Sequence, residues 1–215
     1  NYMYFRYFMW NFAGKQNDEQ GNLDPFNGNW ISGIKFIDEA ALGNVELRSY
    51  WPFIFVNKFS QNNLPEDIKN NKGRNTYYML PLFLGLLGAL FLYQQDKKRF
   101  WVLLVFFLFT GLALKVYLNE RVFEPRERDY ALVGSFYVFA MCIGIGVVAL
   151  AESVKKYLSL RIAAPLSTLL CLLAVPVLMG SQNWDDHDRS NRYTAQSTAK
   201  AYLDSIDEDK DAMIF

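Results

Sequence analysis

The sequence is poor in the residues and motifs that mark most metal and redox sites. It has one histidine, His187, and two cysteines, Cys142 and Cys171, which both lie inside apolar segments. That placement favours free buried thiols over a disulfide or a metal site. A glycine-rich phosphate loop, a nucleophile elbow and a paired-cysteine zinc pattern are all lacking. The formal net charge is zero and no basic stripe occurs, so the sequence predicts no nucleic-acid partner.

Charge is also nearly lacking from four long apolar stretches, which cover residues 77–93, 100–118, 130–150 and 162–180. At 1.5 Å per residue, a helix of about 17 to 21 residues reaches roughly 25–32 Å, about the thickness of the hydrocarbon layer of a bilayer. The hydrophobic fraction of 52% and the aromatic fraction of 17% agree with this interpretation. The one inner charge, Lys115, is close enough to a helix end to extend to the membrane surface. Residues 77–180 are therefore predicted to form about four transmembrane helices.

The segments before these helices have a different composition. Residues 1–14 are dense in Tyr, Phe and Trp around the single cation Arg6, which predicts the end of an upstream membrane helix or a helix lying in the membrane interface. Residues 15–76 are rich in Asn, Gly, Asp and Pro, the residues of turns, and are predicted to form an extracytoplasmic loop.

The segment after the helices, residues 181–215, is predicted to be the start of a soluble C-terminal domain. An amphipathic helix is expected over 193–206, followed by an acidic turn and an apolar run at 212–215 that reads as a strand. Helix, turn and strand together predict an α/β domain. Both ends suggest a piece of a longer polypeptide, because no signal peptide opens the chain and the last strand is cut short. The predicted class is thus an α-helical integral membrane protein with extramembrane loops and the start of an α/β domain.

Glycines within the apolar segments recur at helical spacing. Close packing between membrane helices is the expected use of such small residues. The residues concerned are Gly85, Gly88, Gly134, Gly144 and Gly146.

The connections between the helices favour one orientation. Residues 94–99 and 151–161 are short and basic, and short basic loops prefer the cytoplasm. The opposing loop, 119–129, has three arginines that alternate with acidic residues. On balance we expect a multi-pass protein of the bacterial cytoplasmic (inner) membrane, with its soluble parts in the periplasm.

One charged cluster lies at the start of the third apolar segment. Guanidinium groups match phosphate oxygens, so Arg126 and Arg128 are candidates for binding a lipid phosphate. Glu127 and Asp129 could orient these arginines, act as bases or hold a divalent cation. The alternative is a charged interfacial cap whose side chains pair with one another.

A second charged cluster follows the fourth apolar segment and comprises Asp185, Asp186, His187, Asp188 and Arg189. Its carboxylates could bind a hard divalent cation, with the histidine as a further ligand or a proton shuttle. Its spacing fits neither an EF-hand loop nor a zinc pattern. A turn that caps the following helix is an equally good interpretation.

Four motifs together resemble a family of large bacterial membrane proteins long catalogued only as a domain of unknown function. They are NFAGKQND (residues 11–18), NWISGI (29–34), EPRERDY (124–130) and NWDDHDRS (183–190). That family is similar to the transmembrane O-mannosyltransferases that modify plexin-type receptors. The resemblance covers nearly the whole chain in the expected order, except residues 45–60, and matches the middle part of longer proteins.

The resemblance implies a glycosyltransferase of GT-C type. Such an enzyme takes a sugar, here mannose, from a polyprenyl-phosphate donor and places it on a hydroxyl of an acceptor protein outside the cytoplasm. It further implies that the catalytic carboxylate lies in an earlier loop that nothing in this chain matches. What the chain would supply is cationic groups for the donor phosphate, with Arg126 and Arg128 as the choice, and a groove for the lipid tail. The cluster at 185–189 keeps a structural or acceptor-side role.

The rival hypothesis is a non-catalytic membrane subunit that scaffolds a larger envelope complex. Its aromatic loop and soluble tail would contact other envelope proteins. A transporter is disfavoured, because charges deep within the apolar segments are lacking.

Overall fold

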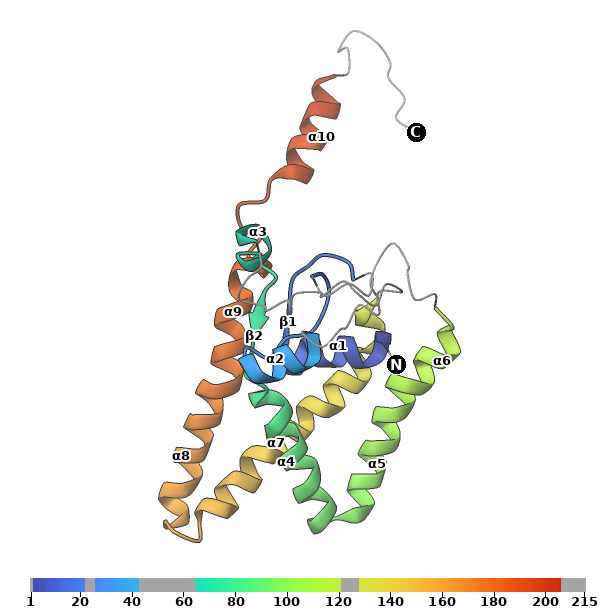
Figure 1. Cartoon of the computed structure of the whole chain (residues 1–215). Coiled ribbons are helices and arrows are strands. Elements are labelled where there is room, and N and C mark those ends of the chain that lie inside the picture. The colour runs from blue at the N-terminus through green and yellow to red at the C-terminus, as the bar shows by residue number, and fades with distance from the viewer. Residues whose placement is uncertain (1, 22–25, 43–64, 121–127, 206–215) are drawn as a thin grey trace, which may run out of the picture. The chain divides into compact units, whose positions relative to one another are not determined.

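The structure, a computed structural model, describes residues 2–21, 26–42, 65–120 and 128–205, and the chain forms two compact units, residues 1–183 and 184–215. The described residues are mostly helical, with one two-stranded sheet (Figure 1). The helices before the long apolar segments are α1 (Tyr2–Phe12), α2 (Lys35–Leu42) and α3 (Glu66–Lys69), and the strands are β1 (Gly14–Lys15) and β2 (Asn75–Thr76). The later helices are α4 (Leu80–Gln95), α5 (Lys97–Leu108), α6 (Leu114–Leu118), α7 (Val133–Val154), α8 (Leu160–Leu172), α9 (Leu178–His187) and α10 (Thr194–Asp204).

Among the described residues, three continuous helices are long and apolar enough to cross a membrane. They are Lys97–Leu118 with 22 residues, Asp129–Val154 with 26 and Leu160–His187 with 28, and we call them the first, second and third spans. The remaining predicted helix, α4, is apolar but has only 16 residues. Three of the four expected helices are therefore confirmed as long enough to span, and the fourth is shorter than expected.

Two of the spans contain a π-helical turn. In the first span it covers Phe109–Ala113, where Gly111 leaves room for the ring of Tyr4. In the third span it covers Leu173–Val177 and includes Pro176, which has no backbone N–H to continue the α-helical pattern. Such turns insert a residue into a helix and shift the direction of the side chains that follow.

Helices α4 and α7 lie with their backbones in contact. A Cβ atom at Gly88 would lie 1.9 Å from the carbonyl oxygen of Cys142, and one at Gly146 would lie 2.2 Å from that of Leu84. The close helix packing predicted for Gly88 and Gly146 is confirmed. The same prediction is wrong for Gly144, because a Cβ added there meets none of the described residues within 4 Å. Cys142 and Cys171 are both buried and free, as expected.

Helix α1 crosses the first and second spans and forms the aromatic core of the larger unit (Figure 1). The ring centroid of Phe8 in α1 lies 5.8 Å from that of Phe107 in the first span and 4.8 Å from that of Phe139 in the second. Its other buried rings are Tyr4, Tyr7, Trp10 and Phe12. The aromatic stretch therefore packs inside the protein.

The polar layer next to α1 is held together by β1. Strand β1 pairs antiparallel with β2, with Gly14 opposite Thr76, and Lys15 also forms a bridge with Trp30. Gly14 has a φ of 143°, and a Cβ there would lie 2.3 Å from the Asn75 carbonyl oxygen. Only glycine fits where these three segments meet.

The two short connections, between α4 and α5 and between α7 and α8, lie at the same end of the helices (Figure 1). This agrees with the expected common side for the basic turns. In the smaller unit, the predicted amphipathic helix is confirmed as α10, whereas the predicted strand at 212–215 lies outside the described residues.

Candidate functional site

A cluster of cations and aromatic rings surrounds α1, and we call it the cation–aromatic cluster. It consists of Arg6, Tyr7, Trp10, Lys15 and Lys115. The Arg6 guanidinium lies 4.8 Å from the Trp10 ring centroid and 5.1 Å from that of Tyr7. Arg6 is only 4% exposed and donates a hydrogen bond to the Gly28 carbonyl oxygen at 3.3 Å. A desolvated cation over an aromatic face gains about 2 kcal/mol, so the rings help to hold Arg6 in place.

Lys15 lies at the open edge of the cluster. Its ammonium is 4.9 Å from the Trp10 ring centroid and 2.5 Å from a carboxylate oxygen of Asp18. Pairing of β1 with β2 and with Trp30 sets the position of the Lys15 backbone. The side chains of Lys15 and Asp18 are 28% and 44% exposed, so this side of the cluster is accessible.

Lys115 approaches the same rings from the first span. Its ammonium lies 5.3 Å from the Tyr7 ring centroid and pairs with the carboxylate of Glu120. The two side chains are only 11% and 5% exposed. The ring of Tyr7 and the carboxylate of Glu120 thus hold the Lys115 ammonium inside the protein.

The indole N–H of Trp10 is a buried hydrogen-bond donor. It has no hydrogen-bond partner among the residues that the structure describes, and Trp10 as a whole is only 7% exposed. A buried donor without a partner costs about 1–3 kcal/mol, so such a group calls for an explanation.

The loop beside the cluster is held by buried amide side chains. Gln16 Oε1 accepts from the Asn29 backbone N–H at 3.2 Å, and Asn17 Oδ1 accepts from the Gly28 N–H at 2.9 Å. Gln16 and Asn17 are almost completely buried. The motifs at 11–18 and 29–34 thus meet in one structural framework that positions Lys15.

A buried carboxylate holds the far end of this loop. Asp38 accepts from the backbone N–H groups of Ser32 and Gly33, at 2.6 and 2.9 Å, and from the Ser32 hydroxyl at 2.8 Å. Burial lowers the pKa of Arg74, and the nearby carboxylate of Asp38 opposes part of that effect. These contacts order the loop.

The third span is tied to the same layer through its amide side chains. Gln182 Oε1 accepts from the Thr76 N–H at 2.6 Å, and Asn183 Nδ2 donates to the Tyr77 hydroxyl at 2.7 Å. These bonds join the third span to β2 and to the residue that follows it.

The predicted phosphate-binding residues are described only in part. Arg126 and Glu127 lie outside the described residues. Arg128 is exposed, and Asp129 Oδ1 accepts from the Tyr130 N–H at 3.0 Å at the start of the second span. Three residues further on, Leu132 is buried against Tyr7 and Trp10. The described end of this motif therefore leads directly into the cation–aromatic cluster.

The residues of the 185–189 cluster do not converge. Asp185, Asp186 and His187 end helix α9, where the nearest oxygen of Asp186 is 3.7 Å from Nδ1 of His187. Asp188 Oδ1 accepts from the Ser190 N–H at 2.9 Å and forms a local turn. No three His, Cys, Asp or Glu side chains gather to hold a metal anywhere in the described part of the chain. Helix α10 begins after Tyr193 without a side-chain cap, so the turn does not cap it as the second interpretation expected.

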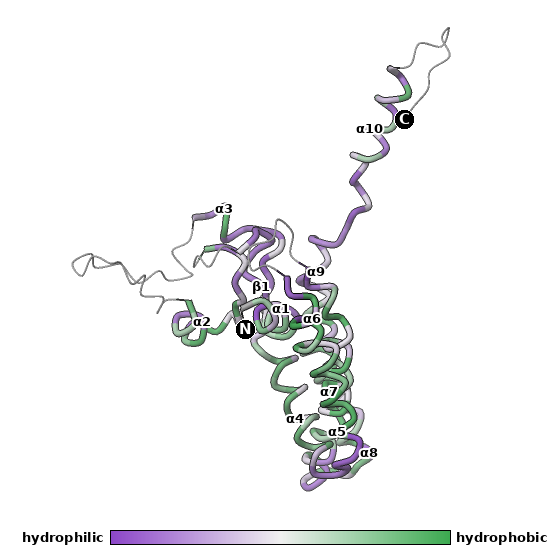
Figure 2. The backbone as a smooth tube through the Cα atoms, turned by 90° about the vertical axis from the view of Figure 1, so that its right-hand side faces the viewer, coloured by the Kyte–Doolittle hydropathy of each residue, from purple (hydrophilic) through white to green (hydrophobic). Residues whose placement is uncertain are grey.

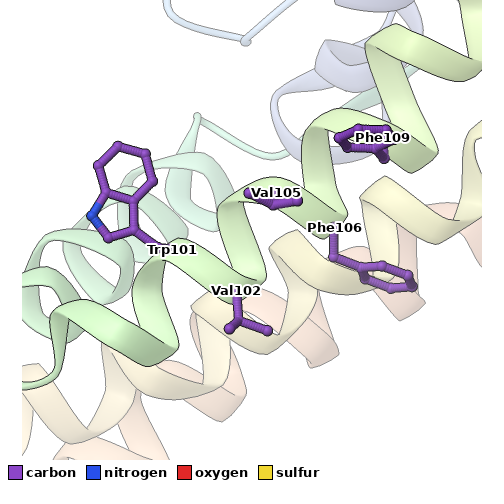
Figure 3. A pocket seen from close by; sticks show the side chains of 5 residues that line it. All are labelled: Trp101, Val102, Val105, Phe106 and Phe109. Atoms are coloured by element: carbon purple, nitrogen blue, oxygen red, sulfur yellow. The ribbon is translucent and has the colours of Figure 1, made fainter.

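A shallow, open apolar depression of about 630 Å³ lies on the surface of the first span (Figure 3). It is lined by Trp101, Val102, Val105, Phe106 and Phe109. Its lining is almost entirely carbon, which suits a hydrocarbon chain.

Sequence reasoning did not select the cation–aromatic cluster. The sequence nevertheless marks two of its members. Arg6 is the one charged residue in the aromatic stretch before residue 13, and Lys115 is the one charged residue within the apolar segment 100–118. Ionisable residues in such surroundings are candidates for function. Their meeting depends on contacts between segments more than 100 residues apart.

Comparison with known proteins identifies no relative: no family model, no curated protein and no solved structure matches the chain.

Proposed function

We propose that the chain is part of a GT-C type glycosyltransferase that uses a polyprenyl-phosphate sugar and modifies protein hydroxyls, with mannose as the sugar. The single observation that carries the proposal is the cation–aromatic cluster, where Arg6, Lys15 and Lys115 meet beside apolar spans. Cations stabilise the charge that develops on a leaving phosphate. The motif at 124–130, which ends next to the cluster, adds Arg126 and Arg128 as donor-phosphate ligands.

The shallow apolar depression on the first span is compatible with the same proposal. A polyprenyl chain is hydrocarbon throughout, and the residues of this depression are aliphatic or aromatic. The acceptor hydroxyl needs a base, and under this proposal that base comes from outside the chain, as the family resemblance implies.

The proposal places the protein in a bacterial inner membrane with its loops in the periplasm. Helix α4 would make a fourth crossing, because it runs from the polar layer to the basic turn and packs along α7. At about 24 Å its 16 residues are short, and a locally thinned bilayer would accommodate them.

The test is transfer of sugar by the protein extracted from its own membrane, with a polyprenyl-phosphate sugar as the donor. Arg126→Ala should raise the KM for the donor and lower turnover, together by about tenfold or more, because a charge-assisted bond to phosphate is lost. Arg99→Ala is the control, since the Arg99 side chain is 82% exposed in the first turn of α5. Unchanged donor use in Arg126→Ala would contradict the proposal.

The second candidate is a non-catalytic scaffold subunit of an envelope complex. The first span favours it, because Val102, Phe109 and Val116 are 68%, 68% and 80% exposed along its outer face. Native mass spectrometry separates the two candidates. A bound polyprenyl-phosphate supports the transferase, whereas stoichiometric partner proteins without that lipid support the scaffold.

A further inference from the structure

We propose that Lys15 and the indole N–H of Trp10 bind the phosphate-ester headgroup of a membrane lipid. The proposal goes beyond the transferase function, because it concerns ordinary anionic phospholipids and holds whether or not the chain transfers sugars. Its starting point is the buried Trp10 N–H, which lacks a hydrogen-bond partner within the described part of the chain. An acceptor brought to this donor removes the cost of leaving it unsatisfied.

The chemistry around Trp10 selects an anionic acceptor. The Trp10 ring centroid lies 4.8 Å from the Arg6 guanidinium and 4.9 Å from the Lys15 ammonium, whereas Lys115 lies beside Tyr7 and is paired with Glu120. These side chains and the indole are donors without acceptor capacity. A group that only accepts and carries negative charge, such as a phosphodiester, therefore complements the site.

The position of the cluster points to a lipid. On one side α1 packs against Phe107, Phe136 and Phe139 of the spans. On the other side its one cation, Arg6, donates to the Gly28 carbonyl oxygen of the polar loop. Figure 2 shows α1 at the level where the hydrophobic helices give way to hydrophilic segments. Headgroups lie at this depth in a bilayer, where Trp, Tyr, Lys and Arg are the usual contacts.

Entry of the headgroup requires exchange of one anion for another on Lys15. In the structure the Lys15 ammonium already pairs with Asp18, whose Oδ1 lies 2.5 Å from Lys15 Nζ. Both side chains are partly exposed, and exposed pairs contribute little, so a phosphate can replace the carboxylate. One phosphate oxygen would then accept from Lys15 Nζ and another from Trp10 Nε1.

The experiment follows the Trp10 indole N–H by ¹⁵N–¹H NMR in phosphatidylcholine nanodiscs with increasing phosphatidylglycerol. Trp10→Phe assigns the resonance by its loss and keeps an apolar ring in the core. A downfield shift that saturates with phosphatidylglycerol is expected. Lys15→Gln should weaken the apparent affinity about tenfold, because a charge-assisted bond is lost.

The most decisive variant is Asp18→Asn. It should increase the affinity for phosphatidylglycerol about two- to fivefold, because it removes the carboxylate that competes for Lys15. Matched controls lie on α2, where Lys35 and Glu39 form a pair at 3.9 Å with side chains 71% and 44% exposed. Lys35→Gln and Glu39→Gln make the same changes of charge and should leave the affinity unchanged.

Three results would overturn the assignment. The first is an indole resonance that does not respond to phosphatidylglycerol. The second is an equal response to Lys15→Gln and Lys35→Gln, which would mean general attraction to the surface. The third is saturation by inorganic phosphate without phosphatidylglycerol, which would mean a site for a free anion. Lys15 also belongs to the cluster proposed for the donor phosphate, and Arg126→Ala separates the two proposals: it should impair sugar transfer and leave the response of Trp10 to phosphatidylglycerol unchanged.

Discussion

Gly88 of α4 and Cys142 of α7 bring their helices into backbone contact, so that a Cβ on Gly88 would lie 1.9 Å from the Cys142 carbonyl oxygen. Gly146, one turn further along α7, is the other half of this contact and faces Leu84 of α4. The pair of helices is therefore held at a separation that only glycine permits at these positions.

Enlarging Gly88 should separate the two helices. Gly88→Val is expected to destabilise the protein by about 1–3 kcal/mol or more, because the added atoms meet backbone that cannot yield easily. Thermal unfolding in detergent micelles measures this as a lower apparent Tm. Gly144→Val is the matched control on α7, since its Cβ meets no described residue. Equal shifts in the two variants would show that helix contact is not the cause.

Removing Lys115 should leave Glu120 as an uncompensated buried charge. Lys115→Met is expected to cost about 3–5 kcal/mol, and Lys115→Met combined with Glu120→Gln should recover most of this loss. The exposed pair Lys155 and Glu152 is the control, and Lys155→Met should cost about 0–1 kcal/mol. The measurement is a double-mutant cycle on unfolding free energies. Additive effects at 115 and 120 would contradict the buried pair.

Gln182 should protect one particular backbone amide. Gln182→Leu removes the acceptor of the Thr76 N–H, which lies 2.6 Å from Gln182 Oε1. Loss of about 0.5–1.5 kcal/mol corresponds to hydrogen exchange roughly 2- to 12-fold faster at Thr76. The Tyr78 amide donates to the Ser32 carbonyl oxygen and should keep its rate. Equal acceleration at both amides would indicate general loosening of the loop.

Asp38 should stabilise the loop that precedes α2. Asp38→Ala leaves the buried N–H of Ser32 and the N–H of Gly33 without their acceptor, at an expected cost of about 3 kcal/mol. Glu39→Ala, in the next position of the same helix, is 44% exposed and should stay within about 0.5 kcal/mol of the parent. Chemical unfolding followed by circular dichroism provides both values. Matching values would mean that the Asp38 contacts add nothing to stability.

The helical membrane character of the chain could be predicted from the sequence because it depends on local composition. A run of about 20 apolar residues satisfies its own backbone by forming a helix, and lipid accepts its side chains. Helix α4 marks the limit of this argument. Its apolar run continues to Tyr77, but Tyr78 and Met79 adopt positive φ angles, and the helix begins only at Leu80.

The cation–aromatic cluster was harder to predict from the sequence than the membrane helices. The sequence places Arg6, Lys15 and Lys115 in three different segments, and nothing in their spacing relates them to one another. The structure brings them together because α1 crosses the spans and β1 folds back beside it. The arginines at 126 and 128 are recognisable from their own sequence neighbours alone.

Composition and periodicity thus determined by themselves that this protein has apolar helices of membrane length, a turn-rich polar loop and an amphipathic helix near its end. Only the tertiary structure decided which glycines touch a neighbouring helix and which way Lys115 points. Gly144 and Gly146 look alike in the sequence, yet one is open and the other lies against Leu84. The reason is physical: helix formation is governed by neighbouring residues, whereas the direction of a side chain depends on how whole helices pack and rotate.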